Sequence, residues 1–561
     1  MRRVLLVVVA TLLLAQPAAA HDRKTLERYA EGTWRSFAAM TDEESGLPPD
    51  ILERNGTRSV QTSTTNIGAY MWSAVAAERL RLISHRELVS RLRKTITSLE
   101  GMDRHESGQF FNWYDHRTGA KLERWPPSGQ PFDNWLSSVD NGWLATGLKV
   151  VAASVPELSR RASALYDSMD FGFYYRPARN QILFHYLPGA ANPDACCYDT
   201  YVSESRIATY IGVSKGEIPP QAVFGTWRSF GDSCDWSWTE TKPVGFNRTY
   251  FGVPVFDGAL AYNDTLVTPS WGGSMFEALM PPLFVPEERW APGSWGANHP
   301  LTVDAQIHHG LVEAGYGYWG FSPANVPEGG YTVYGVDGVG SDPGGNPSGN
   351  NSARVDHGWP GCPNRPALPD PPPEAYTNGV VTPHAAFLGL RYRPHAAVAN
   401  LRRLERDFGV YTRLGFLDSV NVDTGRVSSS YLSLDPGMIM AALGNALGHD
   451  VLRRAFATDD MERSLRPVIG VEEFNSSPRP CTITGTPRAD RLRGTRGPDV
   501  VCGLGGNDTI DARDGDDTVF GDAGDDRIDG GDGDDTLYGG EGDDRADGGR
   551  GFDVVALGPA D

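Results

Sequence analysis

The stretch SWGGSMFEALM at residues 270–280 indicates how the larger part of this chain folds. A serine at 270 or 274 can cap a helix, because its side-chain oxygen accepts a hydrogen bond from a free amide of the first turn. Phe276, Leu279 and Met280 then form the buried stripe of that helix. Glu277 lies inside the apolar run, where an unpaired carboxylate is costly to bury. The stretch therefore predicts a buried helix start whose carboxylate is hydrogen-bonded or functional.

Helical periodicity extends from this stretch over most of the chain. Apolar residues recur at spacings of three and four in several segments, which are separated by long loops rich in aromatic residues, Gly and Pro. Paired helices with functional loops at one end are typical of an α/α barrel. The segments that we expect to be helical are 27–40, 70–82, 87–99, 143–151, 158–167, 205–215, 303–314, 385–390, 394–407 and 438–447.

An aspartate recurs every nine residues along the C-terminal part of the chain, with a glycine two positions before most copies and an aliphatic residue two positions after. The glycine permits a turn with positive φ, the aspartate supplies a charged oxygen, and the aliphatic residue enters a short strand. The pattern resembles the RTX nonapeptide repeat, a parallel β-roll that binds Ca²⁺. The predicted calcium ligands are Asp508, Asp517, Asp526, Asp535, Asp544 and Asp553.

Residues 1–20 resemble a secretory signal. Two arginines are followed by an apolar run over residues 4–14 and by three alanines at 18–20, which offer a cleavage site. The run is short for a membrane span, and no later segment approaches the ~20 apolar residues that a span needs. We therefore expect a secreted protein with no stable membrane span once the signal is removed; an uncleaved anchor is the alternative. RTX tails usually accompany a signal-less export route, so the pathway stays open.

Cysteine usage and charge narrow the class of protein further. Six cysteines in an exported chain favour disulfides, and Cys481 with Cys502 is the pair most easily proposed. The formal net charge is -20, and residues 483–561 carry 20 acidic side chains against 8 arginines. That tail accounts for -12 and leaves -8 for the remainder, so nucleic acid is not an expected partner.

Seven short motifs follow one another in the loops of the helical part. They are TNIG at 65–68, FNWYD at 111–115, SSVDNG at 137–142, YD at 198–199, SESR at 203–206, the 270–280 stretch, and GFLDSVN at 415–421. In this order they resemble the glycoamylase-like family, which contains the bacterial endo-β-1,2-glucanases and the transglycosylating domain of cyclic β-1,2-glucan synthases. The resemblance implies a mostly α chain. An (α/α)6 barrel would occupy 21–475, a β-roll 476–561, and the substrate would be a polysaccharide or oligosaccharide.

Glycoside cleavage normally needs two carboxyl groups, one as an acid and the other as a base or nucleophile. Glu204 is the expected general acid, because it precedes an apolar helix whose surroundings can keep it protonated. The resemblance supports this role; a structural Glu bonded to Arg206 or to nearby amides is the alternative. Asp140 and Asp418 are the two candidates for the base, although Asp140 also fits a helix cap.

Other residues of these motifs are candidates for contact with the sugar. Asp115 is expected to bind or orient the substrate, and Trp113, Tyr114 and Trp271 to stack on it or to join the core. Glu277, weighed against the other loops, fits a carboxylate that binds substrate or supports the catalytic groups.

Several alternatives stay open. The Gly-, Pro- and Asn-rich segment between Tyr334 and Val381 is longer than the family pattern, and Asn378 stands where that pattern has an acid. A loop of this length is usually functional or disordered, so the linkage cleaved can differ from β-1,2. The other readings are a related hydrolase or transglycosylase for another polysaccharide, and a carbohydrate-binding surface protein without catalysis. The chain has no HExxH metal motif and no G-x-S-x-G nucleophile motif.

Overall fold

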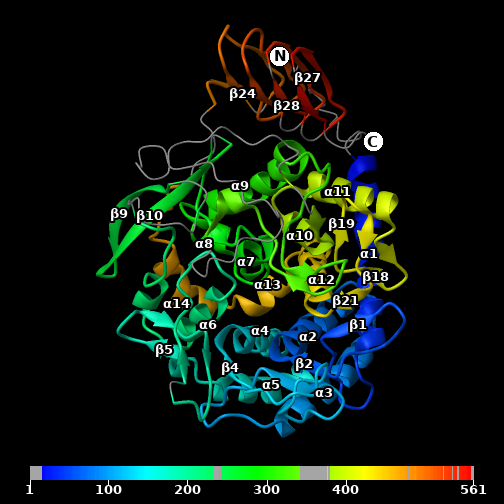
Figure 1. Cartoon of the computed structure of the whole chain (residues 1–561), viewed down its shortest axis with the longest axis vertical. Coiled ribbons are helices and arrows are strands. Elements are labelled where there is room, and N and C mark those ends of the chain that lie inside the picture. The colour runs from blue at the N-terminus through cyan, green and yellow to red at the C-terminus, as the bar shows by residue number, and fades with distance from the viewer. Residues whose placement is uncertain are drawn as a thin grey trace, which may run out of the picture.

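The computed structural model describes residues 16–191, 193–231, 239, 242–263, 265–341, 376, 379–476, 481–486, 488–521, 524–533, 535–539, 542–551 and 553–557. Residues 1–15 of the predicted signal segment are not among these residues, and neither are Cys234, Cys362 and Asn378. Figure 1 shows a large helical body with the C-terminal repeats as a smaller body at one end.

Six helices of the described chain form an inner ring. Contacts join α2 to α4, α4 to α6, α7 to α10, α10 to α12, and α12 back to α2. Arg206 of α6 closes the remaining gap, because its guanidinium donates to the carbonyl oxygens of Glu277 and Ala278 in α7 at 3.0 and 2.6 Å. The inner helices are α2 (Thr64–Arg79), α4 (Ser138–Ser154), α6 (Arg206–Lys215), α7 (Met275–Leu279), α10 (Pro383–Gly389) and α12 (Leu434–Gly448).

Six further helices surround this ring, each against an inner partner. α1 contacts α12, α3 contacts α2, α5 contacts α4, α14 contacts α6, α9 contacts α7, and α11 contacts α10. The outer helix α3 buries one stripe only, whereas α2 is buried over nearly its whole length, as expected for a helix with neighbours on every side. The outer helices are α1 (Gln16–Met40), α3 (His85–Gly101), α5 (Pro156–Ser168), α9 (Trp295–His308), α11 (Pro394–Phe408) and α14 (Asp459–Ile469).

The fold is thus an (α/α)6 barrel, as the resemblance implied. Several helix boundaries were misplaced. The segments expected at 27–40 and 70–82 begin earlier, at Gln16 and Thr64. The segment expected at 303–314 begins at Trp295 and ends in the π-helical turn His309–Glu313. Two short helices, α8 (Glu287–Trp290) and α13 (Val451–Phe456), complete the helical part, and α13 packs on α2, α4 and α12. No helix among the described residues is long and apolar enough to cross a membrane.

The loops of the barrel carry short strands and one long hairpin. Strands β9 (Val244–Tyr250) and β10 (Val253–Tyr262) pair antiparallel, and β11 (Thr265–Val267) extends the sheet. Sequence analysis missed this hairpin because β9 is largely exposed and lacks a clean apolar alternation. The remaining strands are β1 (Ile51–Glu53), β2 (Gln61–Ser63), β3 (Trp113–Asp115), β4 (Leu136–Ser137), β5 (Tyr175–Arg176), β6 (Gln181–Ile182), β7 (His185–Tyr186), β8 (Asp194–Ala195), β12 (Ser270–Trp271), β13 (Ala324–Asn325), β14 (Tyr331–Thr332), β15 (Gly340–Ser341), β16 (Val380–Val381), β17 (Tyr411–Thr412), β18 (Gly415–Phe416), β19 (Val420–Asn421), β20 (Arg426–Val427) and β21 (Ser430–Leu432).

The C-terminal repeats form a roll of two parallel sheets. One sheet contains β22 (Ile483–Thr484), β24 (Val500–Cys502), β26 (Thr518–Phe520), β28 (Thr536–Tyr538) and β30 (Val554–Ala556). The other contains β23 (Arg491–Arg493), β25 (Thr509–Asp511), β27 (Arg527–Asp532) and β29 (Arg545–Arg550). The aliphatic residues of the central repeats, Val501, Ile510, Val519, Ile528 and Leu537, form the core of the roll, whereas Val555 is exposed. A disulfide joins Cys481 to Cys502 as expected.

Candidate active site

The first turns of the inner helices carry most of the candidate acids. Asp140 lies in the first turn of α4, Glu204 two residues before α6, and Glu277 within α7. Thr65, at the start of α2, donates a hydrogen bond of 2.6 Å to Asp140 Oδ1. Because the inner helices start at one end of such a barrel, motifs far apart in the sequence meet there.

Glu204 and Glu277 form a carboxyl pair at this end. Glu277 Oε2 accepts hydrogen bonds from the Ser203 hydroxyl and from the Glu204 backbone amide, both at 2.9 Å, and the Trp143 indole donates to Glu204 Oε2. Removal from water and then the Glu277 charge raise the pKa of Glu204 well above its usual value. Burial raises the pKa of Glu277 to about 7. Both shifts favour the protonated, uncharged form of these carboxyl groups.

Arg206 does not neutralise Glu204, although it stands two residues away. Its guanidinium donates instead to both carboxylate oxygens of Glu287, at 2.7 and 2.9 Å. Although burial opposes ionisation, the charge and hydrogen bonds of Arg206 lower the pKa of Glu287 to about 2. His299 Nε2 lies 3.0 Å from the same carboxylate. This buried network fixes the start of α6 and pairs Arg206 with Glu287 rather than with Glu204.

Asp140 is half-buried and connects to a predicted sugar-binding residue. In the orientation of the Asn112 amide that satisfies both of its polar atoms, its nitrogen donates to Asp140 Oδ2 at 3.0 Å. Its oxygen then accepts from the Trp113 indole at 3.1 Å. Burial raises the pKa of Asp140. Asp50, which the sequence analysis did not single out, lies within electrostatic reach of Asp140, and burial raises the pKa of Asp50 to about 6.

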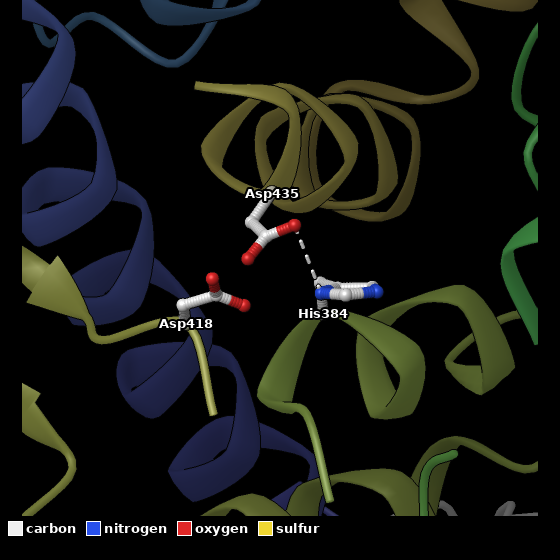
Figure 2. Close-up of side chains that lie close together, drawn as sticks. All are labelled: His384, Asp418 and Asp435. Carbon is white, nitrogen blue, oxygen red and sulfur yellow. Dashed lines mark ion pairs between the residues drawn. The ribbon is translucent and has the colours of Figure 1, made fainter. Parts of the chain in front are cut away.

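Asp418 lies with two residues that the sequence analysis missed as site residues, His384 and Asp435. Figure 2 shows the two carboxylates and the imidazole facing one another from different elements. Asp418 is 2% exposed, and its Oδ2 accepts from the backbone amide of Asn325 at 3.0 Å. His384 Nδ1 lies 3.1 Å from Asp435 Oδ1. Asp435 lies in the first turn of α12 just before Pro436, where an acidic residue commonly stabilises a helix start, so its sequence context carried no functional signal.

Tyr331 lies within electrostatic reach of carboxylates of both groups. It lies on the hairpin of β13 and β14, which is tied to the Asp418 loop because the Ser419 hydroxyl donates to the Asn325 carbonyl oxygen. Surrounding protein, and then the charges of Asp435, Asp418 and Glu204, raise the pKa of the phenol. The residue is nevertheless 54% exposed, so it lies at the surface rather than in the core.

The predicted sugar-contacting residues differ in accessibility. Trp113 and Trp271 are half-buried, and the Trp271 amide bonds to the Val202 carbonyl at 3.1 Å, next to the Glu204 loop. Tyr114 is fully buried and its hydroxyl donates to the Asp103 carbonyl at 2.6 Å, so it is a core side chain here rather than a sugar-stacking surface. Asp115 pairs with Arg117 at 2.6 Å. Two hollows along α3, of about 460 and 800 Å³, contain none of the candidate carboxylates. The acidic residues that line them are Asp42, Glu43, Glu44, Glu87 and Glu157.

The repeat aspartates form a ladder through the roll. The backbone amide of Asp499 donates to Asp517 Oδ1 at 2.7 Å, and that of Asp517 to Asp535 Oδ1 at 2.8 Å. Glycine is required beside them, because a Cβ at Gly530 would lie 2.5 Å from Asp535 Oδ2. Burial and neighbouring carboxylates raise the pKa of Asp517 to about 6. Closely spaced carboxylates and turn carbonyls are the oxygen donors that Ca²⁺ prefers, so these residues fit that ion.

Three family models match parts of the chain. Residues 246–459 match the family described as "Putative glucoamylase", and residues 28–182 match a family described as a protein of unknown function (DUF3131). Residues 484–519 and 520–555 match the RTX calcium-binding nonapeptide repeat.

Comparisons of whole chains agree with these matches. The cyclic β-(1,2)-glucan synthase NdvB of Rhizobium meliloti (strain 1021) is 24% identical over 84% of this chain, which spans about a fifth of that relative, 19% of its length. A putative glucoamylase of Bacteroides uniformis ATCC 8492 is 17% identical with a TM-score of 0.56, over 80% of this chain and 97% of that one. The endo-β-1,2-glucanase of Chitinophaga pinensis, solved with sophorotriose and glucose, is 17% identical with a TM-score of 0.56, over 81% of this chain and 98% of that one.

The barrel geometry, the ordered loops and these matches lead to one assignment. The chain carries a glycoamylase-like domain in an (α/α)6 barrel, followed by RTX calcium-binding repeats.

Proposed function

We propose that this chain is a glycoside hydrolase that cleaves a β-glucan internally at β-1,2 linkages, with Glu204 as the general acid. The observation that carries the proposal is the Glu204–Glu277 pair. A half-buried carboxyl group whose raised pKa favours its protonated form can donate that proton to the oxygen of a leaving sugar. Glu277 orients it through the hydrogen bonds to Ser203 and to the Glu204 amide.

The second carboxylate activates water. In the inverting form of the reaction, Glu204 protonates the leaving oxygen while a base takes a proton from the water that attacks the anomeric carbon. Asp140 and Asp418 are the two proposed bases. Asp140 is half-buried whereas Asp418 is 2% exposed, so Asp140 is the more accessible of the two to water. Comparing Asp140→Asn with Asp418→Asn decides between them, because removal of the base lowers kcat by the larger factor.

The proposed substrate and the proposed secretion rest on a structural relative, on the residues near Glu204 and on the C-terminal repeats. A relative of the same fold was solved with β-1,2-linked glucose oligomers, which supports this linkage for the barrel. The half-buried indoles of Trp113 and Trp271 supply apolar faces for sugar rings, and Asp115 a hydrogen-bond acceptor. RTX repeats are typical of extracellular proteins, which supports secretion of this chain through a signal at 1–20. The proposed domains are the barrel at 21–475 and the roll at 476–561.

The test is hydrolysis of a glycan panel that includes β-1,2-glucan, with the full chain and saturating Ca²⁺. We expect oligosaccharide release from β-1,2-glucan, lowered by at least about 100-fold in Glu204→Gln, since general acid catalysis contributes about 10²–10⁴-fold. The matched control is Glu106→Gln, an exposed glutamate, which should leave the rate unchanged. Full activity of Glu204→Gln would remove it as the acid, and release from another glycan alone would refute the linkage.

A related transglycosylase is the second candidate, because the curated relative NdvB is named a cyclic glucan synthase. Product analysis separates the two reactions. Hydrolysis gives only fragments shorter than the substrate, whereas transfer to a sugar hydroxyl gives longer or cyclic products. Binding of glucan without any product would contradict both enzyme proposals and favour a binding protein.

A further inference from the structure

Three side chains from separate elements direct polar atoms at one point beside the candidate acids. His384 comes from α10, Asp418 from the loop between β18 and β19, and Asp435 from the first turn of α12 (Figure 2). One donor atom from each lies within 4.8 Å of the other two. The three residues are 1%, 2% and 4% exposed, so bulk water does not solvate them.

The atoms that face this point have unused bonding capacity. Among the described residues, His384 Nδ1, Asp418 Oδ1 and both carboxylate oxygens of Asp435 have no hydrogen-bond partner outside the cluster. Inside it, His384 Nδ1 faces Asp435 Oδ1 at 3.1 Å, and the two carboxyl groups face each other. Buried polar atoms are almost always satisfied, and two buried carboxylates side by side also repel each other. A cation at this point would bind these polar atoms and would also neutralise the repulsion between the two carboxylates.

Outer contacts hold the three groups in this orientation. Asn325 donates its backbone amide to Asp418 Oδ2, which leaves Oδ1 directed inward. His384 Nε2 lies 3.4 Å from the Thr382 hydroxyl, so a proton on Nε2 leaves the lone pair of Nδ1 inside the cluster. Metal-binding imidazoles and carboxylates are commonly fixed by such hydrogen bonds on their outer atoms.

We infer that His384, Asp418 and Asp435 bind one divalent first-row transition-metal ion, such as Mn²⁺ or Zn²⁺. An imidazole nitrogen with two carboxylates suits these ions, whereas Ca²⁺ takes oxygen ligands. Neighbouring ligands on such an ion stand roughly 3 Å apart, and His384 Nδ1 lies 3.1 Å from Asp435 Oδ1. The site is separate from the calcium repeats and does not depend on the proposed hydrolysis.

The ion has two consequences for the barrel. It ties α10, α12 and the Asp418 loop together, and with three protein ligands it keeps positions for water or a sugar hydroxyl.

The experiment uses the full chain, stripped with a chelator and then saturated with Ca²⁺ so that the repeats are filled. Mn²⁺ is added and followed by electron paramagnetic resonance. We expect one bound Mn²⁺ per chain with a magnetic coupling to an imidazole nitrogen. His384→Gln and Asp435→Asn should weaken binding by at least about 10-fold, while Asp517→Asn in the repeats leaves it unchanged.

Three outcomes would overturn the inference. They are no Mn²⁺ retained by the folded wild-type chain, bound Mn²⁺ without nitrogen coupling, and equal binding in the wild type and both barrel variants. If Asp418 and Asp435 share a proton instead of a metal ion, the wild-type chain will retain no Mn²⁺. The wild-type measurement tests the metal site even where a variant fails to fold. Because it measures metal binding and not glycan cleavage, a failure of the proposed hydrolysis would give a separate result.

Discussion

Glu277 acts on Glu204 through its charge as well as through hydrogen bonds. The Glu277 carboxylate is the second largest cause, after burial, of the raised pKa of Glu204. Glu277→Gln removes that charge and keeps an acceptor for Ser203. We therefore expect the pKa of Glu204 to fall and the alkaline limb of kcat/KM to move to lower pH.

The pH profile of β-glucan cleavage checks this expectation, with Glu106→Gln as the control that should keep the wild-type profile. An unchanged alkaline limb in Glu277→Gln, at full folding, would mean that the charge of Glu277 does not set the protonation of Glu204.

Arg206 is a second residue whose loss should be costly. Both Arg206 and Glu287 are buried, so removal of the guanidinium leaves an uncompensated carboxylate. Arg206→Met should lower the free energy of unfolding by about 3–5 kcal/mol. The matched control is Arg161→Met, which breaks a surface ion pair with Glu100 worth about 0–1 kcal/mol. Urea denaturation with Ca²⁺ present measures both, and similar losses in the two variants would contradict the difference in burial.

At the scale of elements, the roll depends on Ca²⁺ in a way that the barrel does not. Its core is one short row of aliphatic residues, whereas the barrel has its own extensive core. Without the ion the stacked aspartates repel one another, so chelation should unfold residues 483–561 and leave the barrel folded.

Calorimetry and limited proteolysis with and without chelator check this. Two transitions are expected, of which only the one for the roll disappears on chelation, and Asp517→Asn should weaken that same transition. A single cooperative transition for the whole chain would refute independent folding of the two parts.

At the scale of the molecule, buried acids with raised pKa values set the pH dependence of stability. Burial raises the pKa of Glu277 to about 7 and of Asp50 to about 6, above the values of about 4 expected in the unfolded chain. Between these limits the folded state binds more protons than the unfolded state, so stability falls as pH rises. The melting temperature of the barrel should therefore decrease from about pH 5 to about pH 8.

Scanning calorimetry at constant saturating Ca²⁺ measures this slope. Glu277→Gln should reduce it, because one group that gains protons on folding is removed. A melting temperature that rises across the same range would show that other groups dominate.

Part of this architecture could be predicted from the sequence because its signals are local. The nine-residue phase of the aspartates defines the roll without any distant contact, and the ordered loop motifs indicated the barrel. The β9–β10 hairpin could not be predicted in the same way, because its exposed strands need no regular apolar alternation.

Part of the candidate site could likewise be predicted from the sequence, and part of it only from the tertiary structure. The sequence by itself placed Asp140 and Glu204 at loop–helix junctions and Asp418 in a loop, since periodicity and motif order mark those positions. Only the tertiary structure decided that Glu277 bonds the Glu204 amide, 73 residues away, and that His384 and Asp435 join Asp418. The physical reason is ring closure: side chains at the starts of distant inner helices meet only when the six helices pack into one barrel.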